Sequence, residues 1–263
     1  MHFELKKIYN EDCLITMSKM PNEFIDLVVT SPPYDNLRDY NGYSFPFEGI
    51  AKELYRVTKS GGVLVWVVGD ATIDGSESGT SFRQALYFMQ MGFNLHDTMI
   101  YHKDNFAFPC SNRYYQTFEY MFVFSKGSPK THNLLQVKTT CFNHSSSTYR
   151  NADGTFEVAK YATGKPTRAK ENVWKYGVGN GKGTLDKIAF KHPATFPEQL
   201  VADHIYSWSN KGDLVYDCFG GSGTTAKMAH LQKRNWILSE ISIEYCQIAE
   251  KRIAPYLAQT SLF

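Results

Sequence analysis

The tetrapeptide Ser31-Pro32-Pro33-Tyr34 places a hydroxyl, two prolines and an aromatic ring directly after an apolar run. Proline fixes φ and has no N–H, so the side-chain oxygen of Ser31 and the carbonyl of Pro32 are acceptors on a rigid loop. Two such acceptors suit a planar amine, whose nitrogen is a poor nucleophile until it becomes more sp³-like. Tyr34 offers a face on which a flat ring can stack. Taken alone, the tetrapeptide could also be a rigid turn with an incidental tyrosine.

A second candidate site is a glycine-rich loop near the other end of the chain. Its glycines let the backbone turn tightly and approach a ligand closely. Glu240 follows at the end of the next expected strand, where its carboxylate can accept hydrogen bonds from two ribose hydroxyls. The loop lacks the G-K-[ST] ending of a phosphate-binding loop, so the loop and the acid predict a site for a nucleoside-bearing cofactor. The loop comprises Asp217, Cys218, Phe219, Gly220, Gly221, Ser222, Gly223 and Thr224.

Short apolar runs precede both loops and are typical of buried parallel strands. Segments with helical periodicity alternate with these runs, which predicts an α/β fold with a doubly wound, mainly parallel sheet. Strands are expected over residues 6–12, 24–30, 63–68, 94–101, 120–124, 214–219 and 235–240. Helices are expected over residues 13–19, 47–58, 81–91, 197–207, 224–231 and 243–253.

Residues 125–191 show no sustained hydrophobic periodicity of a helix or a strand. The segment is also too long for an ordinary connection in a compact domain. The surrounding stretch, residues 102–191, carries 14 Lys and Arg against 6 Asp and Glu, although the net charge of the chain is only +2. An acidic body with a basic middle predicts a polyanionic partner held by one segment. A solvated basic face without a partner is the alternative interpretation.

The chain has 263 residues, enough for one large α/β domain with an inserted module. No apolar run approaches the roughly 20 residues of a membrane span, and the N-terminus shows no signal peptide. Its five cysteines form no C-x-x-C pair, which argues against a disulfide framework and a structural zinc site. Cys141 and His144 have C-x-x-H spacing, which we attribute to chance. We expect a cytoplasmic protein without a metal.

Four segments resemble the DNA amino-methyltransferase family, in its permuted β group. Residues 219–223 match its F-x-G-x-G cofactor motif, and residues 31–34 match its [DNS]-P-P-[YFW] catalytic motif. The catalytic motif comes first in the chain, which is the order of the β group. Residues 192–200 resemble the H-P-x-x-F-P motif that precedes the cofactor loop in this group. Residues 10–13 resemble its G-D-C element, with Glu11 in place of glycine.

The resemblance implies a Rossmann-like methyltransferase fold, circularly permuted, with a mostly parallel seven-stranded sheet and one antiparallel strand. Residues 1–124 and 192–263 would form the catalytic domain, and residues 125–191 an inserted basic target recognition region. The implied cofactor is S-adenosylmethionine, with Asp12 at its adenine and Glu240 at its ribose. The other implied cofactor-binding residues are Cys13, Pro193, Phe196, Asp217, Phe219, Gly220, Gly221, Ser222, Gly223 and Thr224.

The implied reaction is direct methyl transfer to the exocyclic amine of a base flipped out of double-stranded DNA. The implied catalytic residues are Ser31, Pro32, Pro33 and Tyr34. Serine at the first motif position is commoner in cytosine N4 enzymes, whereas adenine N6 enzymes often carry aspartate. Cytosine N4 is therefore favoured, and adenine N6 stays open.

The basic middle is expected to bind DNA phosphates through Lys165, Arg168, Lys170 and Lys175. The resemblance implies a prokaryotic or phage-encoded enzyme of the restriction-modification kind. Formation of a homodimer and a cognate restriction endonuclease stay open as partners. A non-enzymatic DNA-binding module is the alternative of another class, because it would need only the basic segment. Such a module would have no reason to keep Asp12, Ser31 and Glu240 together.

Overall fold

The computed structural model describes residues 3–33, 45–105, 112–139, 146–160, 165–179 and 181–260. Its main feature is an eight-stranded sheet in the order β1-β14-β13-β2-β3-β7-β6-β12. Among these strands, β7 runs antiparallel to both neighbours, and the other neighbouring pairs are parallel. The strands are β1 (Lys7–Tyr9), β2 (Ile25–Thr30), β3 (Thr58–Val68), β6 (Asn94–Lys103), β7 (Phe118–Ser125), β12 (Val173–Tyr176), β13 (Leu214–Asp217) and β14 (Asn235–Ser239).

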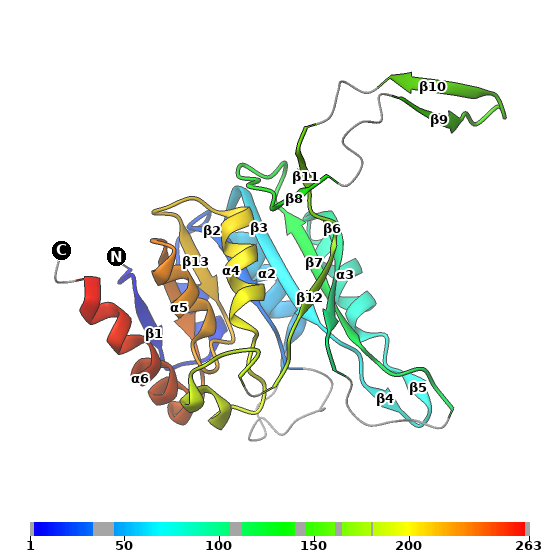
Figure 1. Ribbon diagram of the computed structural model, residues 1–263. Helices are drawn as coiled ribbons and strands as arrows, with labels where there is room; N and C mark the ends of the chain where they lie inside the picture. Colours follow the sequence, from blue (N-terminus) through cyan, green and yellow to red (C-terminus); the bar gives the residue numbers. More distant parts are fainter. Residues whose placement is uncertain are drawn as a thin grey trace. The chain divides into compact units, whose positions relative to one another are not determined.

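Helices cover both faces of this sheet. In Figure 1, α4, α5 and α6 lie in front of the sheet, and α2 and α3 lie behind it. None of the helices in the described part of the chain is long and apolar enough to cross a membrane. The helices are α1 (Cys13–Lys19), α2 (Phe47–Val57), α3 (Thr80–Gln90), α4 (Glu198–Trp208), α5 (Thr224–Leu231) and α6 (Ile243–Thr260), with the 3₁₀ helix η1 at Lys187–Lys191.

An aromatic cluster packs the sheet against α2 and α3. The ring of Phe88 lies 5.0 Å from that of Trp66 and 5.1 Å from that of Phe124, centroid to centroid, and all three side chains are fully buried. The indole N–H of Trp66 donates to Gln84, so its one polar group is satisfied inside the core. Because residues 27–30 of β2 and 63–68 of β3 are buried on both faces, these stretches are almost continuously apolar rather than alternating.

The sheet has one strand more than the seven expected, and this strand comes from the basic middle. β12 adds to the edge of the sheet beside β6, with Trp174 paired to Tyr101. Its residues alternate between exposed and buried, and the buried rings of Trp174 and Tyr176 anchor it. The alternating pattern of a four-residue strand is too short to be recognised within residues 125–191. This explains why the sequence predicted seven strands and not eight.

The chain divides into two compact units, and the smaller one comprises residues 134–171. The larger unit contains the sheet, the helices and the short hairpin β4 (Thr72–Ile73) and β5 (Ser76–Glu77). The smaller unit consists of two antiparallel strand pairs, and none of its residues of described exposure is buried. The residues of this unit whose exposure is known therefore form no buried core. Its pairs are β8 (Gln136–Lys138) with β11 (Thr167–Ala169), and β9 (Ser146–Arg150) with β10 (Phe156–Lys160).

Candidate active site

The sheet brings the two candidate loops together at one edge. β2 and β13 are parallel neighbours, with Val28 paired to Tyr216. Adjacent strands lie about 4.8 Å apart, so the loop that begins at Ser31 and the loop that begins at Cys218 leave the sheet side by side. β14 follows on the other side of β13 and delivers Glu240 to the same edge. The carboxyl ends of parallel strands are where open α/β sheets bind ligands.

A cavity of about 1410 Å³ opens at this edge. One end of it is formed by the ends of β1, β13 and β14 together with residues 190–197. The other end is formed by the end of β6, the start of β7 and residues 112–117. The volume of the cavity exceeds the roughly 300–1,000 Å³ typical of a single small-molecule site. The predicted site residues that line it are Asp12, Cys13, Ser31, Pro32, Pro33, Pro193, Phe196, Asp217, Phe219, Gly220, Gly221, Ser222, Thr224 and Glu240.

Gly223 and Gly221 show why the loop after β13 needs glycine. Gly223 has φ +79°, and a Cβ there would lie 2.8 Å from Cβ of Ala249, closer than two carbon atoms can pack. Gly221 has φ +50°, and its Cβ would lie 3.0 Å from Nε2 of His192. A positive φ disfavours residues with a Cβ at both positions, and the contact with Ala249 excludes even a methyl group at Gly223. The loop is thus pressed between α6 and the wall of residues 190–197.

Glu240 and Asp12 lie at the ends of neighbouring strands on the cavity surface. Glu240 accepts hydrogen bonds from the N–H of Gly221 and of Ser242, both at 2.8 Å, one at each carboxylate oxygen. Burial raises the pKa of Glu240, although these two bonds oppose the shift. A carboxylate has about four acceptor positions, so these bonds leave capacity for further donors. Asp12 caps α1 by accepting from the N–H of Leu14 at 2.7 Å.

Asp217 holds the loops from behind rather than presenting both carboxylate oxygens to the cavity. Its side chain is almost fully buried and accepts from the hydroxyls of Thr30 and Thr225, at 2.6 and 2.7 Å, and from the N–H of Phe219. Burial raises its pKa against the effect of these bonds. The hydroxyls of Ser222 and Thr224 likewise bond the guanidinium of Arg252. These three side chains therefore support the loop.

Cys13 is buried beside Asp12, and burial raises the pKa of its thiol to about 12. A thiol with so high a pKa is almost entirely protonated near neutral pH, so it is a poor nucleophile.

Pro193 and Phe196 line the cavity on the wall that also carries His192. The His192 ring packs edge-on against Tyr245, with centroids 4.3 Å apart.

The segment predicted to be the catalytic loop is described as far as Pro33. Ser31, Pro32 and Pro33 line the cavity directly after β2. Tyr34, on which stacking was expected, lies outside the described residues. The placement of Ser31 beside the glycine loop is nonetheless fixed by the β2–β13 pairing.

The end of the cavity beside β6 and β7 contains residues that the sequence did not single out. Tyr101, Lys103 and Glu119 lie there, and Lys103 donates to Glu119 at 2.5 Å. Tyr114 and Tyr115 lie on the adjoining loop and are exposed. These residues come from segments far from both motifs in the chain, and no spacing pattern connects them. The one available signal was Glu119, a charged residue in the otherwise mostly apolar strand β7.

The basic residues expected to contact DNA fall on different units. Lys165, Arg168 and Lys170 belong to the smaller unit, where Arg168 pairs with Glu171. Lys175 lies on β12 in the larger unit, with its side chain exposed. Lys165 is exposed as well.

Charge at the two ends of the cavity differs. The lining residues beside β1, β13 and β14 include four carboxylates and, among the described residues, no lysine or arginine. Glu11 pairs with Lys19 and Asp217 is buried behind the loop, so Asp12 and Glu240 are the carboxylates that make this end more suited to a cation than to a phosphate. Across the described residues, no group of three or more His, Cys, Asp and Glu could hold a metal ion, while Cys141 and His144 lie outside them. The four carboxylates are Glu11, Asp12, Asp217 and Glu240.

Residues 25–251 match the model of the N6/N4 DNA methylase family. The chain belongs to this family. It is also 61% identical over 242 residues to the orphan methyltransferase M.BamHII of Bacillus amyloliquefaciens, covering 89% of the chain and 90% of that protein. The type II methyltransferase M.BglII of Bacillus subtilis is 26% identical, covering 93% of the chain and 68% of that protein.

Solved structures of low sequence identity share the fold. The cytosine-N4-specific PvuII DNA methyltransferase has a TM-score of 0.67 and 23% identity, covering 96% of the chain and 91% of that structure. The M1.HpyAVI–SAM complex has a TM-score of 0.63 and 22% identity, covering 94% and 98%. Family membership confirms the DNA amino-methyltransferase resemblance and the Rossmann-like fold. The chain is an enzyme, so the alternative of a non-enzymatic DNA-binding module is wrong.

Proposed function

We propose that the enzyme transfers a methyl group from S-adenosylmethionine to the exocyclic amine of a base in double-stranded DNA, and that the base is cytosine, modified at N4. The observation that carries this proposal is the joint placement of Ser31 and the glycine loop on one cavity at the ends of β2 and β13. Both reactants must meet there, because a direct transfer needs the amine and the methyl donor in contact.

The end of the cavity beside β13 and β14 suits S-adenosylmethionine. The carboxylates of Asp12 and Glu240 favour a cationic ligand, and Glu240 has acceptor capacity for the two ribose hydroxyls. Asp12 would lie near the adenine, while Gly220 and Gly221 let the main chain approach the ligand. The cofactor supplies an electrophilic methyl group on a positively charged sulfur.

Ser31 and Pro32 would polarise the acceptor amine. The Ser31 hydroxyl oxygen and the Pro32 carbonyl would each accept a hydrogen bond from one amino proton, which concentrates the lone pair on nitrogen. Both prolines fix these acceptors before the base arrives, so little reorganisation accompanies the reaction. The base would have to leave the duplex, at a cost of roughly a few kcal/mol. Stacking on an aromatic residue, proposed for Tyr34, returns about 1–3 kcal/mol.

The choice of cytosine rests on Ser31 at the first motif position, and adenine N6 is the alternative. The polarising chemistry of Ser31 and Pro32 serves either amine. We further propose that Lys165, Arg168 and Lys170, on the smaller unit of residues 134–171, bind DNA phosphates as part of a target recognition region. The exposure of this unit supports that role. None of its residues whose exposure is known is buried in a core, so its side chains are accessible to DNA.

The decisive experiment is expression of the protein in cells that carry a plasmid, followed by single-molecule sequencing of the plasmid. N4-methylcytosine in one sequence context is the expected result, and N6-methyladenine would establish the alternative base. Plasmid from cells that express the Glu240→Ala variant is the control. An unmodified plasmid, together with no binding of S-adenosylmethionine in calorimetry, would contradict the proposal.

A further inference from the structure

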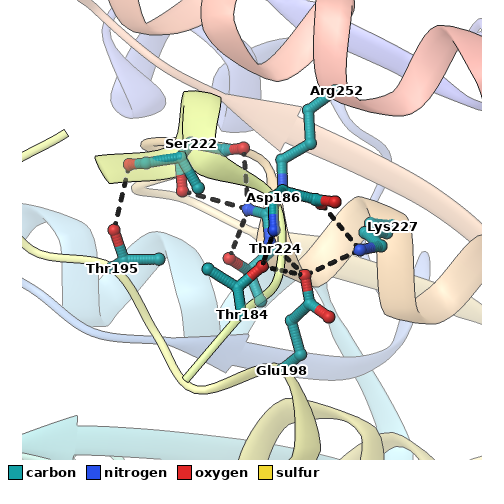
Figure 2. A network of polar contacts seen from close by, with 9 residues as sticks. Thr184, Asp186, Thr195, Glu198, Ser222, Thr224, Lys227 and Arg252 are labelled. Atoms are coloured by element: carbon teal, nitrogen blue, oxygen red, sulfur yellow. Dashed lines mark hydrogen bonds and ion pairs between the residues drawn. The ribbon is translucent and has the colours of Figure 1, made fainter. Parts of the chain in front are cut away.

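A buried ionic cluster lies behind the glycine loop (Figure 2). Its two cations are Arg252 of α6 and Lys227 of α5, whose side chains are 1% and 6% exposed. Its two carboxylates are Asp186 and Glu198, and each receives a bond from both cations at 2.5 to 2.8 Å. Two positive and two negative charges balance, which is the condition under which buried ions are tolerated.

The guanidinium of Arg252 reaches the glycine loop, whereas the ammonium of Lys227 donates to Asp186 and Glu198 on the far side of the cluster. One terminal nitrogen of Arg252 donates to the carbonyl and hydroxyl of Ser222, both at 3.1 Å, and to the hydroxyl of Thr224 at 2.8 Å. The other two nitrogens bind Asp186 and Glu198. The planar fork of arginine can direct donors to all these acceptors at once, which an ammonium group cannot do.

Asp186 and Glu198 connect the Arg252 contacts with the glycine loop to the opposite wall of the cavity. Asp186 immediately precedes η1, and Glu198 begins α4 directly after residues 192–197. The Thr184 hydroxyl donates to Glu198 at 2.6 Å, and the N–H of Glu198 donates to the carbonyl of Gly183 at 2.9 Å. The cluster therefore ties both ends of the segment 183–198, which carries the wall with His192, Pro193 and Phe196, to the loop beside it.

We propose that Arg252 is a positioning residue for the cofactor: it fixes the glycine loop against the wall of residues 190–197 and so sets the affinity for S-adenosylmethionine. This inference rests on the proposed function. Arg252 acts through Ser222 and Thr224 and does not line the cavity itself. The hydroxyls of Ser222 and Thr224 and the carbonyl of Ser222 then hold the loop in place from the side away from the cavity.

The structure offers a matched pair of variants. Arg252→Met and Lys227→Met each remove one buried cation from the same two carboxylates, but only the first removes the bonds to Ser222 and Thr224. We expect Arg252→Met to raise the KM for S-adenosylmethionine by about tenfold or more, the loss of at least one charge-assisted hydrogen bond. The KM for DNA should stay within about twofold, because binding of DNA does not use the loop directly.

Lys227→Met should lower the thermal midpoint by a similar amount but leave the KM for S-adenosylmethionine within about twofold of the wild type. If both variants raise this KM equally, in step with their loss of stability, the cluster is merely structural and the inference is wrong. Should Arg252→Met fail to fold, Arg252→Lys keeps the charge beside Asp186 and Glu198 but cannot also hold Ser222 and Thr224. A wild-type KM in a stable Arg252→Lys variant would equally overturn the inference.

Failure of the proposed function would look different. Wild-type protein that binds no S-adenosylmethionine in calorimetry would contradict the proposed function itself. Wild-type protein that binds it, alongside an Arg252→Met variant of unchanged affinity, would contradict only the role of Arg252.

Discussion

The hydroxyl of Thr30 donates a hydrogen bond of 2.6 Å to Oδ1 of Asp217, across 187 positions of the chain. Thr30 is the last residue of β2 and precedes Ser31, and Asp217 is the last residue of β13 and precedes the glycine loop. One buried hydrogen bond thus joins the residues that directly precede the two loops on which the proposed reaction depends. It fixes the distance between the proposed amine acceptors and the proposed cofactor loop.

Thr30→Val should lower both the free energy of unfolding and kcat. The valine keeps the shape of threonine but removes one of three donors to a buried carboxylate, which costs about 1–3 kcal/mol of unfolding free energy. Because the lost bond joins the two loops, kcat should fall as well. The measurement is turnover on plasmid DNA beside denaturant unfolding.

Thr225→Val provides the control for Thr30→Val. Thr225 donates to the other oxygen of Asp217 at 2.7 Å, but it lies on α5, next to the glycine loop in sequence, and its contact with the Val29 carbonyl of β2 is long, at 3.5 Å. A similar loss of stability with a smaller loss of kcat is expected. Equal effects of the two variants on kcat would show that the link between the loops has no catalytic role.

Ser31→Ala should lower kcat by about two orders of magnitude, the typical effect of removing one preorganised polar group aimed at the reacting atoms. The affinity for S-adenosylmethionine should not change, because Ser31 belongs to the acceptor side of the proposed site. Rapid-quench methylation assays and calorimetry test the two statements separately. Normal turnover in this variant would rule out the proposed role of the Ser31 hydroxyl.

Binding of S-adenosylmethionine should weaken as the pH falls on the acid side of neutrality. Burial raises the pKa of Glu240 in the free enzyme, so this carboxyl takes up a proton at a higher pH than an ordinary glutamate. The protonated form loses acceptor capacity for the ribose hydroxyls, and affinity should fall as the pH drops through the raised pKa. Calorimetry over a pH series should show this decline in the wild type.

Glu240→Gln is the matched variant for the pH experiment. It can still accept from Gly221 or Ser242 but does not titrate, so its affinity should be lower than that of the wild type at neutral pH. Its dependence on pH should be nearly flat. A slope as steep as that of the wild type would assign the titration to another group.

Replacing Lys165 and Arg168 by alanine should weaken DNA binding and reduce the dependence of log Kd on log salt by roughly one to two units, about 0.9 per lost phosphate contact. The control is Lys211→Ala, because Lys211 is exposed and precedes β13, at the opposite edge of the sheet from the site. Fluorescence anisotropy over a salt series measures both slopes. An unchanged slope in the double variant would remove residues 165–168 from the proposed DNA contacts.

The sequence alone determined the local structure of both loops. Prolines after an apolar run stop a strand at Thr30, and glycines with positive φ permit the turn after Asp217, because these effects depend on neighbouring residues only. The helix over Thr224–Leu231 and the strand over residues 235–239 follow from local period for the same reason. The order of the motifs was sufficient to indicate the family.

Tertiary structure decided what lies behind and opposite the loops. Arg252 lies on the apolar stripe of α6 with Cys246, Ala249 and Ile253, which is a signal of a buried charge. Its partners, however, come from three separate segments of the chain. β12 joined the main sheet because Trp174 and Tyr176 bury against it, which a four-residue period cannot reveal. Contacts between residues distant in the chain depend on the packing of whole elements, and local sequence does not encode them.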